Sequence, residues 1–451
     1  MTGLARASVR HRRGGSAATF LSVFLGAAIL MAFASMLDTG GGPGVPDTDR
    51  SALGIMASVV GGWGAVIVAS AVATTVAVAA RQRAGELALL RTVGATPGQV
   101  TRLLVGEVAL VGVLGVLAAV PVGYGAGAGL LAALEHSGQI SHGTGYRFGG
   151  AALGIGAGGC LLAALVAAWL TGRRWARRTA RSALAEASAG GRRMSRFRLV
   201  AGFVLVLAGV NCGVTTMTVM DGKQMATQSV AAEGAILSSL GFALLAPLLL
   251  RGATALLAPL LTALGGPAAQ LGMLGVRQRL QRAATPMMPI VVCTAISTGT
   301  LYMEAIWNGG RHPAAADDKG TEMLNYVVVG MIAVFAAVML VNLLVAEIAG
   351  RSGEFARLRL TGATPRQILR LVGAETALML VTGLVFGSVA ALLSVVPYSV
   401  AVSDRALPDI SAGVYAAVVA GVVALTVAAS VTATRRAVRL PMTGALRGVA
   451  R

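Results

Sequence analysis

The charged residues best placed to act together form two matching sets that lie 268 positions apart. The first set is Arg83, Glu86, Arg91 and Arg102, and the second is Arg351, Glu354, Arg359 and Arg370. Within each set, an arginine and a glutamate three positions apart share one face of a helix, where they can form an ion pair. The same groups, repeated on an exposed surface, can dock a partner protein. The chemistry that they predict is electrostatic: pairing within the chain and binding of a second protein.

Each charged set belongs to a longer duplicated segment, here called a cassette. The first cassette spans residues 83–107 and the second spans residues 351–375, and 14 of the 25 aligned positions are identical. An internal repeat indicates an architecture of similar units. Apolar membrane helices tolerate exchange, whereas here Arg, Glu, Gly, Thr, Pro and Gln are retained in register. The two cassettes are therefore expected to perform the same task.

The cassettes also carry the signals for a helix, a sharp turn and a new helix. Gly94 and Gly362 are glycines of the kind favoured at the C′ position of a helix. The following Thr96-Pro97-Gly98-Gln99 offers a threonine N-cap, a proline at the first helical position and a glutamine that completes a capping box. Thr364-Pro365-Arg366-Gln367 repeats that arrangement. An ordinary well-capped turn explains these residues but not the repeated charges, so a docking surface is the favoured interpretation.

The elements that must position these turns are membrane helices. Hydrophobic residues make up 56% of the chain, charged residues 12%, and the mean hydropathy is +0.77. These values are typical of a polytopic membrane protein. Runs of roughly 20 apolar residues predict membrane spans. Ten are expected, at residues 16–37, 53–80, 103–134, 150–171, 199–220, 231–250, 286–307, 323–348, 371–397 and 412–434.

The distribution of basic residues sets the expected orientation. With both termini cytoplasmic, 31 of the 37 arginines and lysines fall on the inner side. This asymmetry is the positive-inside signal, and it accounts for the net charge of +19 without nucleic-acid binding. Nine arginines lie in the inner segment 172–198, which predicts contact with anionic lipid, with a protein partner as the alternative. The first apolar run is longer than a signal-peptide core and is predicted to be an uncleaved span.

The fold expected from these patterns is an all-α integral membrane protein with two parallel four-helix units and a two-helix linker. The first unit is predicted at residues 1–180, the linker with helices 5 and 6 at 181–265, and the second unit at 266–451. The motif Val9-Arg10-x-Arg12 before the first span recurs as Val276-Arg277-x-Arg279 before the seventh. The five outer loops, the first of them at 38–52, are too short to fold as separate domains.

Two carboxylates occupy equivalent places at the start of membrane helices. Glu107 and Glu375 lie about one turn inside helices 3 and 9, where an ionisable residue suggests function by default. A structural role is favoured near the interface, with pairing to a coupling arginine such as Arg102 or Arg370. The sequence has no G-x-x-x-x-G-K-[ST] motif, no recognisable catalytic triad and no convincing set of metal ligands. No catalytic residue, metal or cofactor is therefore expected in this chain.

The string E-L-A-L-L-R-T-V-G-A-T-P-x-Q in the first cassette, nearly repeated in the second, resembles the signature of the FtsX-like permease family. This ABC-transporter superfamily includes MacB- and LolC-like proteins. The resemblance covers helices 1–4 and 7–10, and implies that each four-helix unit pairs with one separate ATPase subunit. The chain departs from many members in lacking a large outer domain between the first two helices of a unit.

The resemblance implies a non-enzymatic permease subunit that couples ATP hydrolysis by its partner to export or to mechanical work. Expected partners are membrane lipids and two copies of a soluble ABC ATPase, which would bind ATP and Mg²⁺, in a bacterial plasma membrane. The alternatives are a non-transporting mechanical or signalling protein and, less favoured, an ion-coupled transporter. The residues expected to dock the ATPase are Arg83, Glu86, Arg91, Gly94, Ala95, Thr96, Pro97, Gln99, Arg102, Arg351, Glu354, Arg359, Gly362, Ala363, Thr364, Pro365, Gln367 and Arg370.

Overall fold

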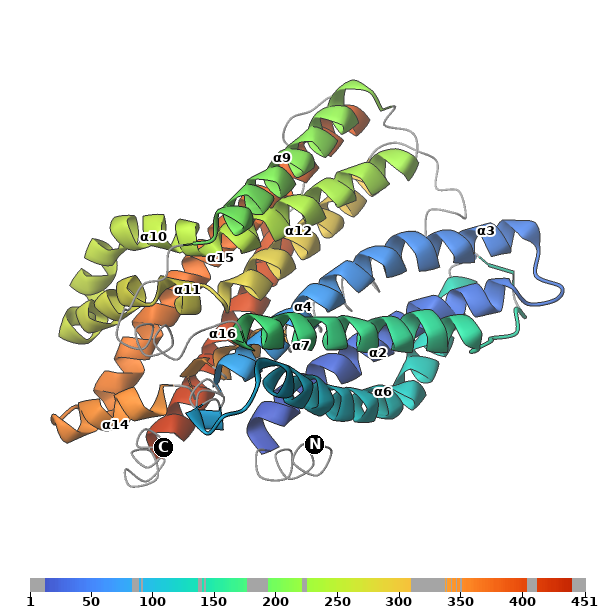
Figure 1. Cartoon of the computed structure of the whole chain (residues 1–451). Coiled ribbons are helices and arrows are strands. Elements are labelled where there is room, and N and C mark those ends of the chain that lie inside the picture. The colour runs from blue at the N-terminus through green and yellow to red at the C-terminus, as the bar shows by residue number, and fades with distance from the viewer. Residues whose placement is uncertain are drawn as a thin grey trace. The chain divides into compact units, whose positions relative to one another are not determined.

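The computed structural model describes most of the chain and shows helices joined by turns. The described residues are 13–82, 89–90, 92–136, 140–141, 143–176, 194–220, 225–309, 337, 339–341, 343–345, 347–348, 351–403 and 412–439. None of them lies in a β-strand. Long uncharged runs form helices in a bilayer because a helix satisfies its own backbone hydrogen bonds where water is absent. The expected all-α class is thus observed in the part of the chain that is described (Figure 1).

The chain divides into two compact units. The first contains α2 (Arg13–Gly40), α3 (Asp47–Ile55), η1 (Met56–Val60), α4 (Gly61–Gln82), α6 (Pro97–His136), η2 (Ala152–Gly158) and α7 (Gly159–Ala176). Here α2 packs against α4 and α6, and α7 packs against α4 and α6. A hydrogen bond of 3.1 Å between the Ser22 and Thr75 hydroxyls joins α2 to α4. These contacts make a four-helix unit.

The second unit includes two helices that have no counterpart in the first, α9 (Arg196–Thr218) and the first part of α10 (Met225–Gln278). It also contains α11 (Leu280–Ala283), α12 (Met287–Gly309), α14 (Ser352–Leu360), α15 (Pro365–Ser403) and α16 (Ala412–Arg439). Both α9 and α10 pack against α15. The two helices predicted as a linker therefore pack as part of this unit, while the boundaries at 180 and 265 remain predictions.

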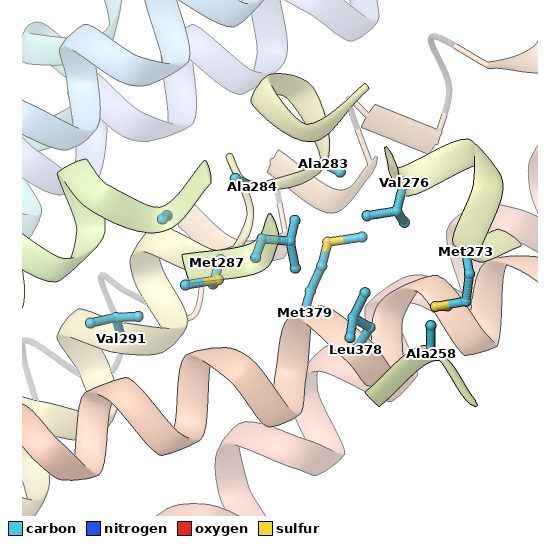
Figure 2. Packing of buried hydrophobic residues seen from close by; sticks show 11 residues of the cluster. Ala258, Met273, Val276, Ala283, Ala284, Met287, Val291, Leu378 and Met379 are labelled. Atoms are coloured by element: carbon cyan, nitrogen blue, oxygen red, sulfur yellow. The ribbon is translucent and has the colours of Figure 1, made fainter. Parts of the chain in front are cut away.

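Leu378 and Met379 of α15 belong to one of the buried apolar clusters of the second unit (Figure 2). Around them pack Leu250, Val276 and Met287, from α10 and α12. All five side chains are at most 6% exposed. This cluster fixes the position of α15 relative to the end of α10 and the start of α12.

Eight helices in the described residues are long and apolar enough to cross a membrane. They correspond to eight of the ten predicted spans. The predicted span 53–80 falls within α3, η1 and α4, where the apolar stretch Gly64–Ala77 is shorter than a full span. The predicted span 323–348 lies mostly outside the described residues. The total of ten therefore remains a prediction.

The first outer loop is shorter than predicted, because α2 continues to Gly40 and α3 already begins at Asp47. The Asp38 carboxylate accepts hydrogen bonds from the backbone N–H groups of Gly149, Ala151 and Ala152, at 2.8–2.9 Å. It thereby satisfies donors at the start of the fourth helix, as an N-cap would. The predicted loop 38–52 is therefore mostly helical, and Asp38 at its start is hydrogen-bonded to the backbone at the start of the fourth helix.

Candidate functional site: the two capped turns

Both turns have the capping geometry that the sequence predicts. In the first, the Gln99 N–H donates to Thr96 Oγ1 at 3.3 Å, and the Thr96 N–H donates to Gln99 Oε1 at 2.8 Å. Thr364 and Gln367 repeat the two bonds at 3.3 and 2.8 Å. These reciprocal bonds define a capping box, which satisfies backbone donors that a helix start leaves free. The capping prediction is confirmed in both cassettes.

The glycines before these caps reverse the chain. Gly94 and Gly362 have φ values of 102° and 96°, in a region that L-residues with a Cβ seldom occupy. The Ala363 N–H donates to the Leu358 carbonyl at 2.9 Å, and the Gly362 N–H donates to the Arg359 carbonyl at 3.1 Å. This pair of bonds is the Schellman motif that ends a helix at a left-handed C′ residue. The C′ assignment is therefore confirmed.

Each turn leads into one uninterrupted helix. α6 starts at Pro97 and has 40 residues, and α15 starts at Pro365 and has 39 residues. At 1.5 Å per residue, each helix is about 60 Å long, enough to reach from the turn across a bilayer. Each turn is thus directly continuous with a helix that can cross the membrane.

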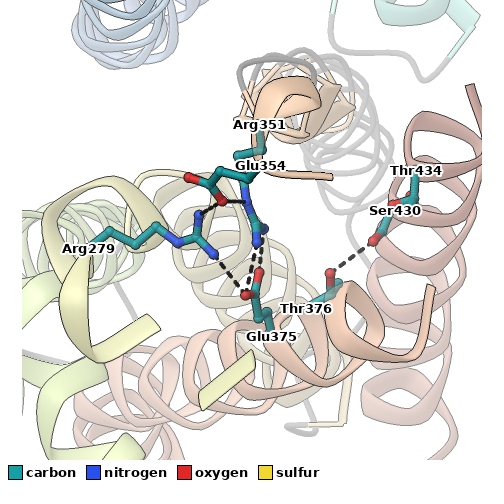
Figure 3. A network of polar contacts seen from close by, with 7 residues as sticks. All are labelled: Arg279, Arg351, Glu354, Glu375, Thr376, Ser430 and Thr434. Carbon is teal, nitrogen blue, oxygen red and sulfur yellow. Dashed lines mark hydrogen bonds and ion pairs between the residues drawn. The ribbon is translucent and has the colours of Figure 1, made fainter. Parts of the chain in front are cut away.

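The start of the second cassette is fixed by a network of four charged side chains (Figure 3). Arg351 donates two hydrogen bonds to the Glu375 carboxylate, one of them from Nη2 at 3.1 Å. Arg279 donates from Nη2 to the same carboxylate at 3.0 Å, and from Nη1 to Glu354 at 2.7 Å. Arg351 Nε lies 3.2 Å from Glu354, which confirms the ion pair expected from their i,i+3 spacing. Two arginines and two glutamates thus neutralise each other.

The network is partly buried, so its charges depend on one another. The side chains of Glu375 and Arg351 are 3% and 9% exposed, whereas that of Glu354 is 55% exposed. Burial acts to raise the pKa of Glu354, but the Arg279 and Arg351 charges outweigh it and lower that pKa. Burial acts to lower the pKa of Arg351, but Glu375 and Glu354 outweigh it and raise that pKa. Both shifts favour the charged forms.

Further contacts attach α14 to the end of α16. Phe355, 1% exposed, packs in a cluster that includes Ile368 of α15 and Val438 of α16. The guanidinium of Arg351 lies 5.0 Å from the centre of the Phe355 ring, within cation–π range. Arg359 Nη1 donates to the Val438 carbonyl at 2.9 Å, near the C-terminus of α16. The second turn is therefore attached to both neighbouring membrane helices.

The predicted docking residues divide into exposed and inward-facing groups. The exposed residues are Gly94, Thr96, Pro97, Gln99, Arg102, Glu354, Gly362, Thr364, Pro365, Gln367 and Arg370, and Ala95 and Ala363 are partly exposed. Arg351 is buried, and Arg359 is partly buried and bound to Val438. Arg83, Glu86 and Arg91 lie outside the described residues. In the second cassette, two of the predicted docking charges, Arg351 and Arg359, therefore bind within the chain and stabilise the turn.

Glu375 has different partners from the one suggested by its position. It pairs with Arg351 and Arg279 rather than with Arg370, which is exposed. Arg279 belongs to the duplicated V-R-x-R motif, a signal that marked the residue without showing its partner. Glu107, the equivalent of Glu375 in the first cassette, is also buried, at 6% exposed. It lines a small cavity with Thr19, Val76, Leu104 and Thr171.

The docking charges also have apolar neighbours that the charge pattern did not indicate. Val93 is 82% exposed at the first turn, and Leu360 is 62% exposed at the second. Leu89, just before the first turn, is 60% exposed. The signal was present in the sequence as apolar residues in a polar segment between two predicted spans. Exposed apolar residues rimmed by polar ones are typical of protein interfaces.

Comparison with protein families identifies both repeats. The family profile described as "FtsX-like permease C-terminal" matches residues 55–180 and 326–442, together more than half of the chain. Each matched segment contains one cassette and the helix that follows it. No curated protein matches the chain. The two-segment match agrees with the internal repeat.

Proposed function

This chain belongs to the FtsX-like permease family, and from that premise we propose that its two cytoplasmic turns couple a separate ABC ATPase to movement of the membrane helices. Membership makes the chain a multi-pass membrane permease component of an ABC-type system. The ATPase would bind ATP and Mg²⁺. The permease would use the resulting movement for export or for mechanical work at the membrane.

The observation that carries the proposal is the division of labour within the second cassette. Its tip presents Leu360, Arg366 and Arg370 to solvent, while Arg351 and Glu375 are buried beneath it. An exposed tip suits reversible binding, because apolar and arginine side chains dominate the energetics of interfaces. A buried ionic base suits transmission, because the tip is then held to α15 and α16 and cannot move independently of them.

The proposed stroke follows from these attachments. ATP-driven closure of two ATPase subunits would displace both turns, and each turn is continuous with a helix of about 60 Å. Packed helices respond to such a displacement by moving as rigid bodies. In the second unit, the Arg279–Glu354–Glu375 contacts would carry the movement to the start of α12 as well. The proposed cellular location is a bacterial plasma membrane, with the turns and both termini in the cytoplasm.

The docking assignment is tested by placing a charge at each apolar tip. The variant with Val93→Asp and Leu360→Asp should bind the ABC ATPase that co-purifies with the wild-type chain about 30-fold more weakly, because interface anchors are worth about 2 kcal/mol or more. Affinity is measured by titrating the ATPase onto immobilised permease. Neither substitution should affect membrane insertion, because both residues are in water.

Val219→Asp serves as the matched control. Val219 is 77% exposed, like the tip residues. It lies just after the C-terminal end of α9, whereas Arg196 lies at the N-terminal end. The control should retain wild-type affinity for the ATPase. Wild-type affinity of the double variant would exclude the two turns as the docking surface.

A further inference from the structure

A long uncharged segment separates the sixth and seventh predicted spans. Residues 252–276 contain no Asp, Glu, Lys or Arg, although the orientation predicted from the basic residues places them on the cytoplasmic side. Arg251 precedes this segment, and Arg277, Arg279 and Arg282 follow it. A water-exposed connection of 25 residues would ordinarily carry charges. The composition therefore indicates an apolar environment.

The segment forms a helical hairpin with one bend. α10 continues through it without leaving the helical conformation except at Gly266, where φ is 63° and ψ is −154°. The next residue is Pro267, which cannot continue the backbone hydrogen bonding of the preceding helix. The arms on either side of this Gly-Pro bend, together residues 252–276, are here called the apolar hairpin.

One face of the apolar hairpin is anchored in the second unit. Ala258 of the first arm and Met273 and Val276 of the second are at most 6% exposed. They pack in the cluster formed with Leu378 and Met379 of α15 (Figure 2). The hairpin is therefore a fixed part of the unit, and its level along α15 is set by this packing.

The opposite face is apolar and exposed. Leu256 and Leu260, four residues apart, are 79% and 57% exposed on the first arm. Leu271 and Leu274, three residues apart, are 55% and 49% exposed on the second. Spacings of three and four residues place side chains on one face of a helix. Each arm thus presents a pair of leucines away from the protein core.

We propose that the apolar hairpin is an interfacial membrane anchor, whose four exposed leucines insert into the acyl boundary of the cytoplasmic leaflet. The depth of the hairpin supports this assignment: Arg279, three residues after it, pairs with Glu354 of the second cassette and with Glu375 at the start of the membrane helix. Exposed Arg251 and Arg277 flank the hairpin at both ends, where they can bind anionic lipid headgroups.

The anchor gives the second turn a reference point in the bilayer. Arg279 connects the hairpin to both glutamates of the network, so α14 is linked to a segment held at the lipid surface and moves relative to it. This assignment does not depend on ATPase docking, since the leucines would contact lipid whether or not a partner is bound.

The test compares lipid contact at three exposed leucines. Single cysteines replace Leu256, Leu207 or Leu360 in protein whose three native cysteines are changed to alanine, and each is labelled with an environment-sensitive fluorophore. Leu207 is 65% exposed on the membrane helix α9 and reports acyl chains, whereas Leu360 is 62% exposed at the cytoplasmic turn and reports water. The purified chain is reconstituted without ATPase into phosphatidylethanolamine–phosphatidylglycerol vesicles.

Brominated phospholipid should quench the label at Leu256 at least about twofold more than the label at Leu360, because an interfacial helix buries its apolar face among the acyl chains. Quenching at Leu256 should approach that at Leu207. Aqueous iodide should give the reverse order. Strong iodide quenching at Leu256 without quenching by brominated lipid would overturn the proposal. Protection from both quenchers that is lost when the chain is diluted in lipid would also overturn it, because a second copy would then cover the leucines.

Discussion

At the scale of single residues, the two arginines and two glutamates of the second cassette have unequal roles. Glu375 is the centre of the network, since it accepts hydrogen bonds from both Arg351 and Arg279. Glu354 binds the same two arginines from a position where water reaches it. Removing one partner of a buried ion pair leaves an uncompensated charge, whereas an exposed pair contributes little. The two glutamates should therefore differ strongly on substitution.

The residue-scale prediction is that Glu375→Gln lowers the free energy of unfolding by about 3 kcal/mol, because buried Arg351 loses its buried counter-charge and keeps only the exposed Glu354. The matched variant Glu354→Gln should cost about 1 kcal/mol or less, since its side chain is half exposed. Denaturant unfolding in detergent measures both. The double variant Arg351→Met with Glu375→Met should recover part of the loss, since an apolar pair can replace a buried ionic one. Equal losses for the two single glutamine variants would contradict a central role for Glu375.

At the scale of elements, the network requires α10 and α15 to approach closely. A Cβ atom added at Gly275 would lie 2.9 Å from Arg279 Nη2 and 3.3 Å from Glu375 Oε1. A Cβ atom added at Gly272 would lie 3.0 Å from the Leu371 carbonyl oxygen. The side of α10 that faces α15 therefore leaves little room at these two positions, where a side chain would have to displace Arg279 or the backbone of α15. The crossing of the two helices determines whether Arg279 can reach Glu375.

The element-scale prediction is that Gly275→Val destabilises the second unit by about 2 kcal/mol, because an added side chain overpacks the crossing and displaces Arg279. Gly252→Val is the control on the same helix, since a Cβ at Gly252 meets no atom within 4 Å. Both substitutions change helix propensity equally, so their difference reports the crossing alone. Thermal unfolding of the two purified variants provides the measurement, and identical transition temperatures would show that the crossing is not tight.

At the scale of the whole molecule, the internal duplication places two copies of the same turn on one chain. Two segments of one chain match the same family profile, and each contains a turn with the same capping box and the same left-handed glycine. A permease with one such unit per chain would need two copies to present two turns. This chain carries both turns covalently.

The whole-molecule prediction is that one copy of this chain assembles with two ATPase subunits. The physical reason is that each turn is proposed as a separate docking surface, and the two exposed tips differ in sequence, with Val93 and Gly98 in one and Thr361 and Arg366 in the other. Native mass spectrometry of the complex purified in detergent gives the subunit ratio. A complex of two permease chains with two ATPase subunits would contradict the prediction.

Features that depend on neighbouring residues or on composition could be predicted from the amino-acid sequence alone. The capping boxes join residues three positions apart, and the positive φ values follow from glycine itself, so local spacing is enough to assign the roles of Thr96, Thr364, Gly94 and Gly362. Apolar run length predicted the membrane helices, because the bilayer imposes a minimum length on every span. The i,i+3 pair of Arg351 and Glu354 was predictable for the same local reason.

Which charges pair and which apolar residues remain exposed depends on the tertiary structure and could not be predicted from local sequence. Glu375 pairs with Arg351, 24 positions away, and with Arg279, 96 positions away, instead of the nearby Arg370. That choice depends on the crossing of α10 and α15, which is set by packing among residues far apart in the chain. The continuation of α2 and α3 into the predicted outer loop, and the outward leucines of the apolar hairpin, depend on packing in the same way. Local patterns specify the ends of helices, but the partners of a buried charge are specified by the way the helices pack.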